Sequence, residues 1–158
     1  MEGRASGQDQ PPITPAWGLM MRKISDIVRN RDPVTFRPNA AVRDACRSMR
    51  EHRVGAVLVT EGDHRLLGIF TARDAVHRVL AEGKSAARTK LAEVMTRDPD
   101  TMPPRTTAIE ALRLMEDGRY RHVPIVDAGK VVGIVSRFDF NGIELDRLDE
   151  ETGLWERI

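Results

Sequence analysis

Two stretches of the chain carry apolar side chains at the i, i+3, i+4, i+7 spacing of one helical face. Their apolar positions are Val42, Ala45, Cys46 and Met49 in the first stretch and Ala108, Ala111, Leu112 and Met115 in the second. Thr107, followed three residues later by Glu110, is a capping-box signature for the second helix, and Asn39 is a candidate cap for the first. The pattern predicts two amphipathic helices of similar design, with Cys46 and both methionines facing a core.

Each of these helices is followed by two short apolar runs in which β-branched residues dominate, as in buried strands. The runs cover residues 54–59 and 66–70 after the first helix and residues 122–126 and 131–135 after the second. A polar turn containing Gly62 or Gly129 separates the runs of each pair, so each pair is predicted to form a β-hairpin. Further helices are expected to start at Thr71 and Ser136, and the first should end before Gly83.

The two series of elements are copies of one repeat. RDPVTFRP at residues 31–38 returns as RDPDTMPP at residues 97–104, and RLLGIFTARD, which ends at Asp74, returns as KVVGIVSRFD, which ends at Asp139. With a short extended segment at residues 34–36, each copy is predicted to be a β-α-β-β-α unit. A unit of about 60 residues buries so little surface that it would be only marginally stable alone. We therefore expect an α/β (α+β) fold in which the two units pack through their sheets into one pseudo-symmetric module.

Two tandem β-α-β-β-α units, each closing with Gly-Ile-hydrophobic-[Thr/Ser]-x-x-Asp, resemble a pair of CBS domains, also called a Bateman module. The resemblance covers roughly residues 20–148. It divides the chain into a flexible lead at 1–19, CBS domain 1 at 20–82, a linker at 83–89, CBS domain 2 at 90–148 and a C-terminal tail at 149–158. The resemblance implies a cleft between the units that binds an adenosine compound (AMP, ADP, ATP or S-adenosylmethionine), and a homodimer.

The resemblance also assigns candidate ligand-binding residues. The ribose-binding aspartate falls on Asp74 and Asp139, and the hydroxyl that faces a phosphate falls on Thr71 and Ser136. Unpaired N–H groups and partial positive charge make a helix N-terminus suited to phosphate, and a carboxylate accepts hydrogen bonds from a ribose diol. The residues expected beside the adenine rings are Thr35 and Val57 for one site and Thr101 and Val123 for the other.

Basic residues are distributed unequally between the copies. Arg121 and His122 stand where the family often places a phosphate-binding residue, whereas the first copy has Gly55 and Ala56, which argues against a polyphosphate in the first site. Arg73 and Arg137 are further candidates for ligand contact. Purely structural roles remain open for all of these residues. Thr71-x-x-Asp74 and Ser136-x-x-Asp139 have the spacing of ordinary capping boxes, and the arginines are equally suited to a solvated surface.

The amino-acid composition argues against several classes of function. The 158 residues are 41% hydrophobic, and 25 Lys and Arg balance 24 Asp and Glu, so no global field favours nucleic acid or a membrane. The single cysteine excludes an internal disulfide, and the histidines lack metal-ligand spacing, so no metal is expected. No apolar run reaches the length of a membrane span, and residues 1–10 are polar, so we expect a cytoplasmic protein.

The leading hypothesis is therefore a regulatory module, not an enzyme, that senses an adenosine compound and signals to a partner protein through a conformational shift. No required cofactor is expected. The alternative is a structural or interaction protein of the same fold that docks a partner through its dimer face or through the apolar tail residues Leu154, Trp155 and Ile158. An enzyme ranks third, because no catalytic triad, metal cluster or glycine-rich phosphate loop is evident.

Overall fold

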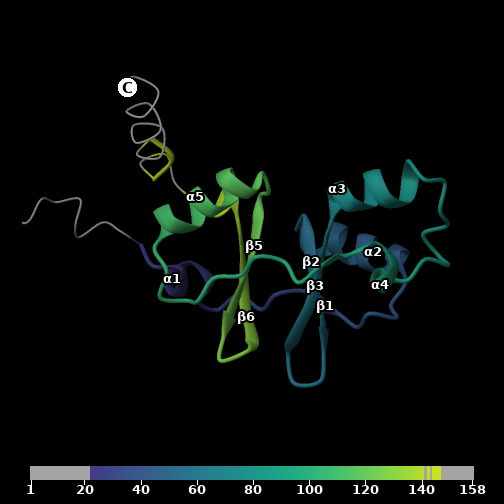
Figure 1. The fold of residues 1–158 in the computed structure, drawn as a ribbon, viewed down its shortest axis with the longest axis horizontal. Helices are drawn as coiled ribbons and strands as arrows, with labels where there is room; N and C mark the ends of the chain where they lie inside the picture. Colours follow the sequence, from purple (N-terminus) through teal and green to yellow (C-terminus); the bar gives the residue numbers. More distant parts are fainter. Residues whose placement is uncertain (1–21, 141, 143, 147–158) are drawn as a thin grey trace, which may run out of the picture.

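The computed structural model describes residues 22–140, 142 and 144–146. The predicted lead at 1–19 and the tail at 149–158 lie outside these residues. In chain order the elements are α1 (Ile24–Val28), β1 (Thr35–Phe36), α2 (Val42–His52), β2 (Ala56–Glu61), β3 (Arg65–Thr71), α3 (Ala72–Asp74), η2 (Ala75–Leu80), α4 (Leu91–Val94), β4 (Thr96–Arg97), α5 (Ala108–Gly118), β5 (His122–Asp127), β6 (Lys130–Ser136) and η3 (Arg137–Asp139). Figure 1 shows two hairpins side by side, each with its helices on the outer side.

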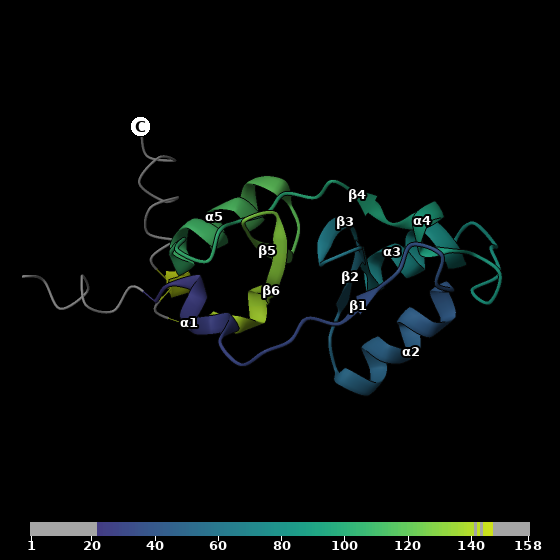
Figure 2. The same cartoon turned by 90° about the horizontal axis from the view of Figure 1, so that it is seen from below.

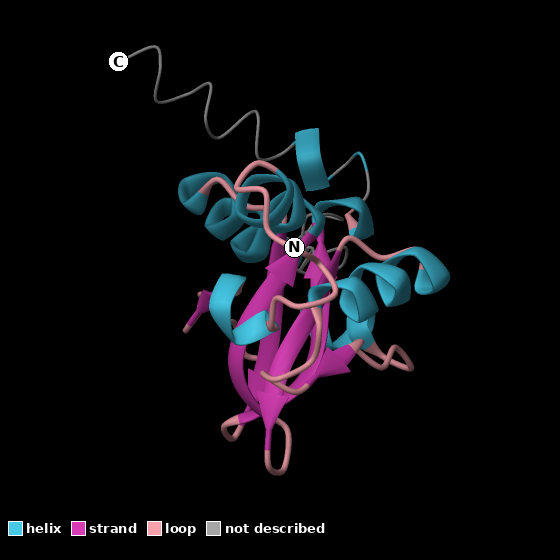
Figure 3. Ribbon diagram, turned by 90° about the vertical axis from the view of Figure 1, so that its right-hand side faces the viewer, coloured by secondary structure: helices cyan, strands magenta, loops and turns pink. Residues whose placement is uncertain are grey.

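The two antiparallel hairpins, β2–β3 and β5–β6, form the centre of the molecule, as predicted. β1 pairs in parallel with β2, and the strand order is β1-β2-β3-β6-β5, with β4 added to β3. A single pair, Arg65 with Lys130, joins the hairpins near their turns. Figure 3 looks along the pair of hairpins and shows the helices beside and above them. The mixed α/β fold class is confirmed.

Apolar side chains from both hairpins fill the space between them. The buried members of this cluster are Ala56, Leu58, Ile69 and Val131, with Leu66, Val126 and Ile134 packed against them. These side chains alternate with those that face the helices, because successive residues of a strand point to opposite faces of a sheet. The expected packing of the two units through their sheets is therefore confirmed.

The amphipathic helices α2 and α5 lie where the periodicity places them, and Met49 and Met115 are buried. The capping box of α5 is confirmed, since Glu110 N–H donates to Thr107 Oγ1 and Thr107 N–H donates to Glu110 Oε2. The predicted cap Asn39 is wrong, because the N-cap of α2 is Ala41, which makes no side-chain hydrogen bond. Carbonyls of the segment before α4 replace it: Val42 N–H donates to Thr89 O.

Two short helices that the periodicity did not predict each pack against the opposite half of the molecule (Figure 2). Helix α1 precedes the first copy but packs into the core of the second, where Ile24, Ile27 and Val28 are buried against α5, β5 and β6 residues. Helix α4 precedes the second copy but packs into the core of the first, where Leu91 and Val94 are buried. Each half is therefore completed by a helix from the other half of the sequence.

Two glycines of the repeated strands make room for these crossing segments. A Cβ on Gly133 of β6 would lie 2.8 Å from Val28 Cβ of α1. A Cβ on Gly68, at the matching position of β3, would lie 2.7 Å from the carbonyl oxygen of Thr96 in β4. The shared Gly-Ile of the two copies is thus explained by close approach of another segment to the strand.

Candidate functional site

A cavity of about 930 Å³ lies between the two halves, at the ends of β3 and β6 away from the hairpin turns. Five predicted ligand residues line it: Thr71, Arg73, Asp74, Arg121 and His122. The first three come from the start of α3 in the first half, and the last two come from the start of β5 in the second. The cavity is therefore built jointly by both copies of the repeat.

Asp74 presents its carboxylate to this cavity from the first turn of α3. Thr71 N–H donates to Asp74 Oδ2 at 3.0 Å, and Asp74 N–H donates to Thr71 Oγ1 at 3.1 Å. This capping box fixes both side chains, and a further hydrogen bond from Ala72 N–H to Gly55 O ties the helix start to β2. The second oxygen, Oδ1, lies 3.7 Å from Arg78 Nε, whose guanidinium already donates to Val94 O. Asp74 Oδ1 thus keeps capacity to accept hydrogen bonds from a ligand.

Three exposed guanidinium groups and two more carboxylates border the same cavity. The arginines are Arg73, Arg119 and Arg121, and the carboxylates are Asp98 and Asp100. Tyr120 O–H donates to Asp100 Oδ2 at 2.7 Å, and burial together with this carboxylate raises the pKa of the Tyr120 phenol, which stays a donor at neutral pH. The cavity therefore combines acceptors suited to sugar hydroxyls with cations suited to phosphate oxygens.

His122 is the most enclosed basic group of the cavity. Its ring lies over Gly55, where an added Cβ would come within 3.3 Å of Cε1 and Nε2. Burial lowers the pKa of the imidazole, and the nearby Arg121 lowers it further, while Asp139 opposes the shift. The lowered pKa favours the neutral imidazole at pH 7.

This shift predicts a pH dependence of stability. Because His122 binds its proton more weakly in the folded chain, the unfolded chain takes up the proton first as the pH falls below about 6.5. The stability contributed by the neutral imidazole is present above that pH and is lost as the pH falls through it. We expect the free energy of unfolding, measured by urea denaturation at pH 7, 6 and 5, to fall less steeply in His122→Asn than in the wild type.

The exposed His52 provides the control for this measurement. His52→Asn makes the same replacement on the exposed surface of α2, away from the cavity, and serves as the matched comparison. Equal slopes for His122→Asn and wild type would contradict the assignment.

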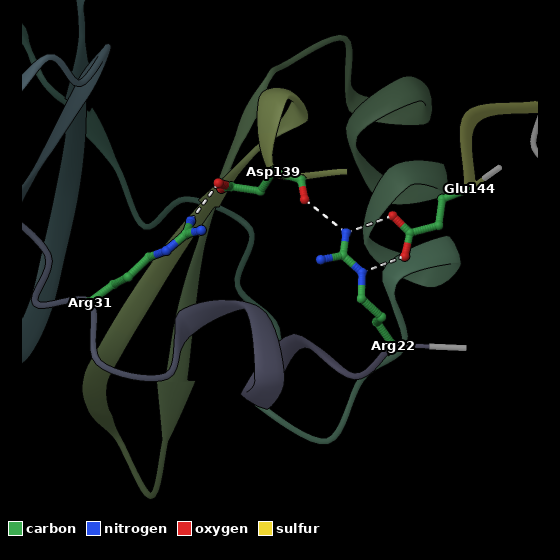
Figure 4. Close-up of polar contacts among 4 residues, drawn as sticks. All are labelled: Arg22, Arg31, Asp139 and Glu144. Carbon is green, nitrogen blue, oxygen red and sulfur yellow. Dashed lines mark hydrogen bonds and ion pairs between the residues drawn. The ribbon is translucent and has the colours of Figure 1, made fainter. Parts of the chain in front are cut away.

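The second aspartate, Asp139, has a different environment (Figure 4). Its Oδ2 accepts from Ser136 N–H at 2.7 Å, which repeats the arrangement at Asp74. Its Oδ1 forms an ion pair with Arg31 Nη1 at 2.5 Å. Asp139 does not line the cavity. Asp139 is the last residue of the 3₁₀ turn η3, which has Ser136 as its N-cap, whereas in the first copy α3 is followed directly by the π-helical η2.

The other predicted ligand residues also lie outside this cavity. Val57 and Val123 are fully buried in the cores of the first and second halves, so their side chains cannot line it. Thr35 and Thr101 are exposed, although Pro99 and Asp100, just before Thr101, do line it. Ser136 and Arg137 stay with Asp139 at η3.

Basic residues of the second copy lie beside the first aspartate, although the first copy itself has Gly55 and Ala56 at the matching positions. Arg121 and His122 lie beside Asp74 because the start of β5 faces the end of β3 across the two hairpins. Sequence reasoning also missed several residues of the cavity wall: His77, Thr96, Asp98, Pro99, Asp100, Arg119, Tyr120 and Phe138. The repeated Arg-Asp-Pro motif was a usable signal for Asp98 and Pro99.

The described ranges hold no group of three or more His, Cys, Asp or Glu side chains placed to bind a metal ion. Among the same residues, no helix has the length and apolar character needed to cross a bilayer.

A model of the CBS domain matches residues 24–81 and 91–143, one match for each copy of the repeat. The chain therefore belongs to the CBS-domain family. CBS domain-containing protein CBSCBSPB2 of Arabidopsis thaliana is 41% identical over 102 residues, which are 65% of this chain and 19% of the relative. The chain spans about a fifth of the length of this and the next two Arabidopsis relatives.

Solved structures agree with this assignment. The CBS-domain containing protein ATU1752 from Agrobacterium tumefaciens is 33% identical, with a TM-score of 0.68 over 74% of this chain and 89% of that one. A CBS domain protein from Pyrobaculum aerophilum, solved in complex with AMP, is 23% identical, with a TM-score of 0.72 over 82% of this chain and 99% of that one. The second likeness establishes the fold alone.

Proposed function

We propose that this CBS pair is a regulatory module that binds an adenine nucleotide, or the related S-adenosylmethionine, in the cavity at Asp74. The observation that carries the proposal is the joint construction of the cavity: the Asp74 carboxylate comes from one half, and Arg121 and His122 come from the other. A ribose diol can donate to the Asp74 carboxylate while phosphate oxygens face the arginines. The AMP complex of the Pyrobaculum relative supports this class of ligand.

A ligand that contacts both halves favours one arrangement of them over others in proportion to its differential affinity. The halves are joined by the exchanged helices and by the apolar cluster between the hairpins, so a change at the cavity reaches the outer helices. In this proposal the module passes its ligand state to a partner protein and carries out no chemistry itself. The proposed setting is the cytoplasm.

The proposal is tested by titration calorimetry of the full chain with AMP, ADP, ATP and S-adenosylmethionine. We expect at least one of them to bind with a dissociation constant below about 1 mM, which corresponds to about 4 kcal/mol of binding free energy. Absence of binding for all four at that concentration would overturn the proposal.

An interaction role of the same fold is the second candidate, and exposed apolar side chains favour it. Val76 and Leu80 of η2 and Phe138 of η3 are 52%, 73% and 87% exposed. Such residues are suited to self-association or to docking a partner. A homodimer in analytical ultracentrifugation that binds none of the four compounds would support this candidate.

A further inference from the structure

The two aspartates of the repeated closing motif differ in their position, since Asp74 lines the cavity and Asp139 does not, and also in their ion pairs. Their side chains are similarly shielded, with 15% exposed for Asp74 and 18% for Asp139. Each gives one oxygen to the N–H of its own cap residue. The remaining oxygen of Asp139 is paired with Arg31 at 2.5 Å, whereas that of Asp74 lies 3.7 Å from a guanidinium engaged elsewhere. Exposure therefore does not distinguish the two carboxylates, but the closeness of the cation does, since Arg31 lies 2.5 Å from Asp139 and Arg78 lies 3.7 Å from Asp74.

Arg31 is held at Asp139 by the exchanged helix α1. The buried side chains Ile24, Ile27 and Val28 anchor this helix in the second core, and Arg31 lies three residues beyond its end. At the other end of α1, Arg22 donates to both carboxylate oxygens of Glu144 and to the carbonyl oxygen of Asp139, each at 2.9 Å. Figure 4 shows Arg22 and Arg31 reaching Asp139 from opposite ends of this segment.

The residue equivalent to Arg31 in the second copy makes no such ion pair with a closing-motif aspartate among the contacts of the described residues. Arg97 occupies the position of Arg31 in the repeated Arg-Asp-Pro motif, but it belongs to β4, which pairs with Gly68 and Ile69 of β3. Its guanidinium donates to Ala92 O. The following residue, Asp98, lines the cavity instead. The pseudo-symmetry of the chain is broken at this pair of arginines.

We propose that Arg31 determines which of the two aspartates binds nucleotide: it occupies the Asp139 carboxylate as an internal cation, so each chain takes one nucleotide, at Asp74. This inference rests on the proposed function. A ribose hydroxyl would have to displace a charge-assisted hydrogen bond at Asp139, and a neutral donor is a poor substitute for a guanidinium there. At Asp74 the same hydroxyl competes only with the longer, 3.7 Å ion pair to Arg78.

Calorimetry with the tightest-binding compound of the four measures the stoichiometry directly. We expect one site per chain in the wild type and two in Arg31→Ala, because the Asp139 carboxylate is then released to accept hydrogen bonds from a ribose. Arg29→Ala is the matched control: Arg29 lies on the same segment, pairs with Asp26 on the surface and should leave one site. One site in Arg31→Ala would overturn the inference, as would two sites in the wild type of which Asp139→Asn removes one.

Melting temperatures without nucleotide separate this inference from the proposed function. If Arg31 pairs with Asp139 in solution, Arg31→Ala and Asp139→Asn each lower the melting temperature. The double variant then has a melting temperature no lower than that of the less stable single variant. Additive losses would show that the pair is not formed and would overturn the inference even if nucleotide binds at Asp74. The remaining outcome is that the melting temperatures are non-additive but the wild type binds no nucleotide. This outcome would overturn the proposed function, and with it the inference that each chain binds one nucleotide.

Discussion

Asp74→Asn is expected to weaken nucleotide binding by about 10- to 100-fold, the equivalent of losing charge-assisted hydrogen bonds worth about 1.5–3 kcal/mol. The amide keeps an oxygen that can accept from Thr71 N–H, so the start of α3 should persist. What is lost is the negative charge that faces the ligand hydroxyls. Titration calorimetry with the compound that the wild type binds measures the change.

Asp44→Asn is the control for this substitution. Asp44 lies on the exposed face of α2, its carboxylate 4.0 Å from Arg47, so its replacement should leave the affinity unchanged. Unaltered binding by Asp74→Asn, with circular dichroism showing an intact fold, would place the nucleotide elsewhere.

Leu91→Ala is expected to lower the free energy of unfolding by about 2–5 kcal/mol. Leu91 is fully buried in the core of the first half, although it belongs to the second copy of the repeat. Removing its branched side chain leaves a cavity among α2, β2 and β3 residues that the fixed backbone cannot close fully. Urea denaturation followed by circular dichroism gives the difference.

Leu80→Ala provides the comparison, since Leu80 is 73% exposed at the end of η2. It should change the stability by no more than about 0.5 kcal/mol. A similarly small loss for Leu91→Ala would mean that α4 does not pack into the first half.

Local patterns predicted much of the fold because its main elements are defined locally. The helical spacing of α2 and α5, the capping box at Thr107 and the turns of both hairpins are all encoded within a few residues of each other. Strand β2 begins at Ala56, two residues later than predicted, because Val54 N–H still donates to Met49 O at the end of α2. That hydrogen bond belongs to the C-cap of α2, where Arg53 has a left-handed backbone conformation, and a run of apolar residues does not indicate it.

The helices α1 and α4 were missed for a related reason. Each has only one turn or so of apolar residues, and its partners lie in the other half of the chain. Periodicity detects a helix with a face long enough to repeat, and these two do not. The assigned domain boundaries stay a prediction, although the exchange means that each core draws on residues from both sides of the linker at 83–89.

The sequence indicated both aspartates but could not rank them. Their motifs are nearly identical, and the difference lies in Arg31, 108 residues away from Asp139. Likewise, the resemblance assigned Arg121 and His122 to the site of the second copy, to which they belong, whereas the side-by-side hairpins bring them to the cavity at the first aspartate. Which residues share a site depends on the packing of the copies and not on their order.

The exchange of α1 and α4 also constrains how such a repeat could exist by itself. A polypeptide with only one copy would carry its short leading helix away from its own core and would leave an apolar groove where the other copy's helix belongs. Two such molecules could fill each other's grooves only by exchanging these helices in a dimer, so their folding would depend on protein concentration. When the copies are joined in one chain, the helix exchange is intramolecular. The cavity between the halves then forms in every molecule, whatever the protein concentration.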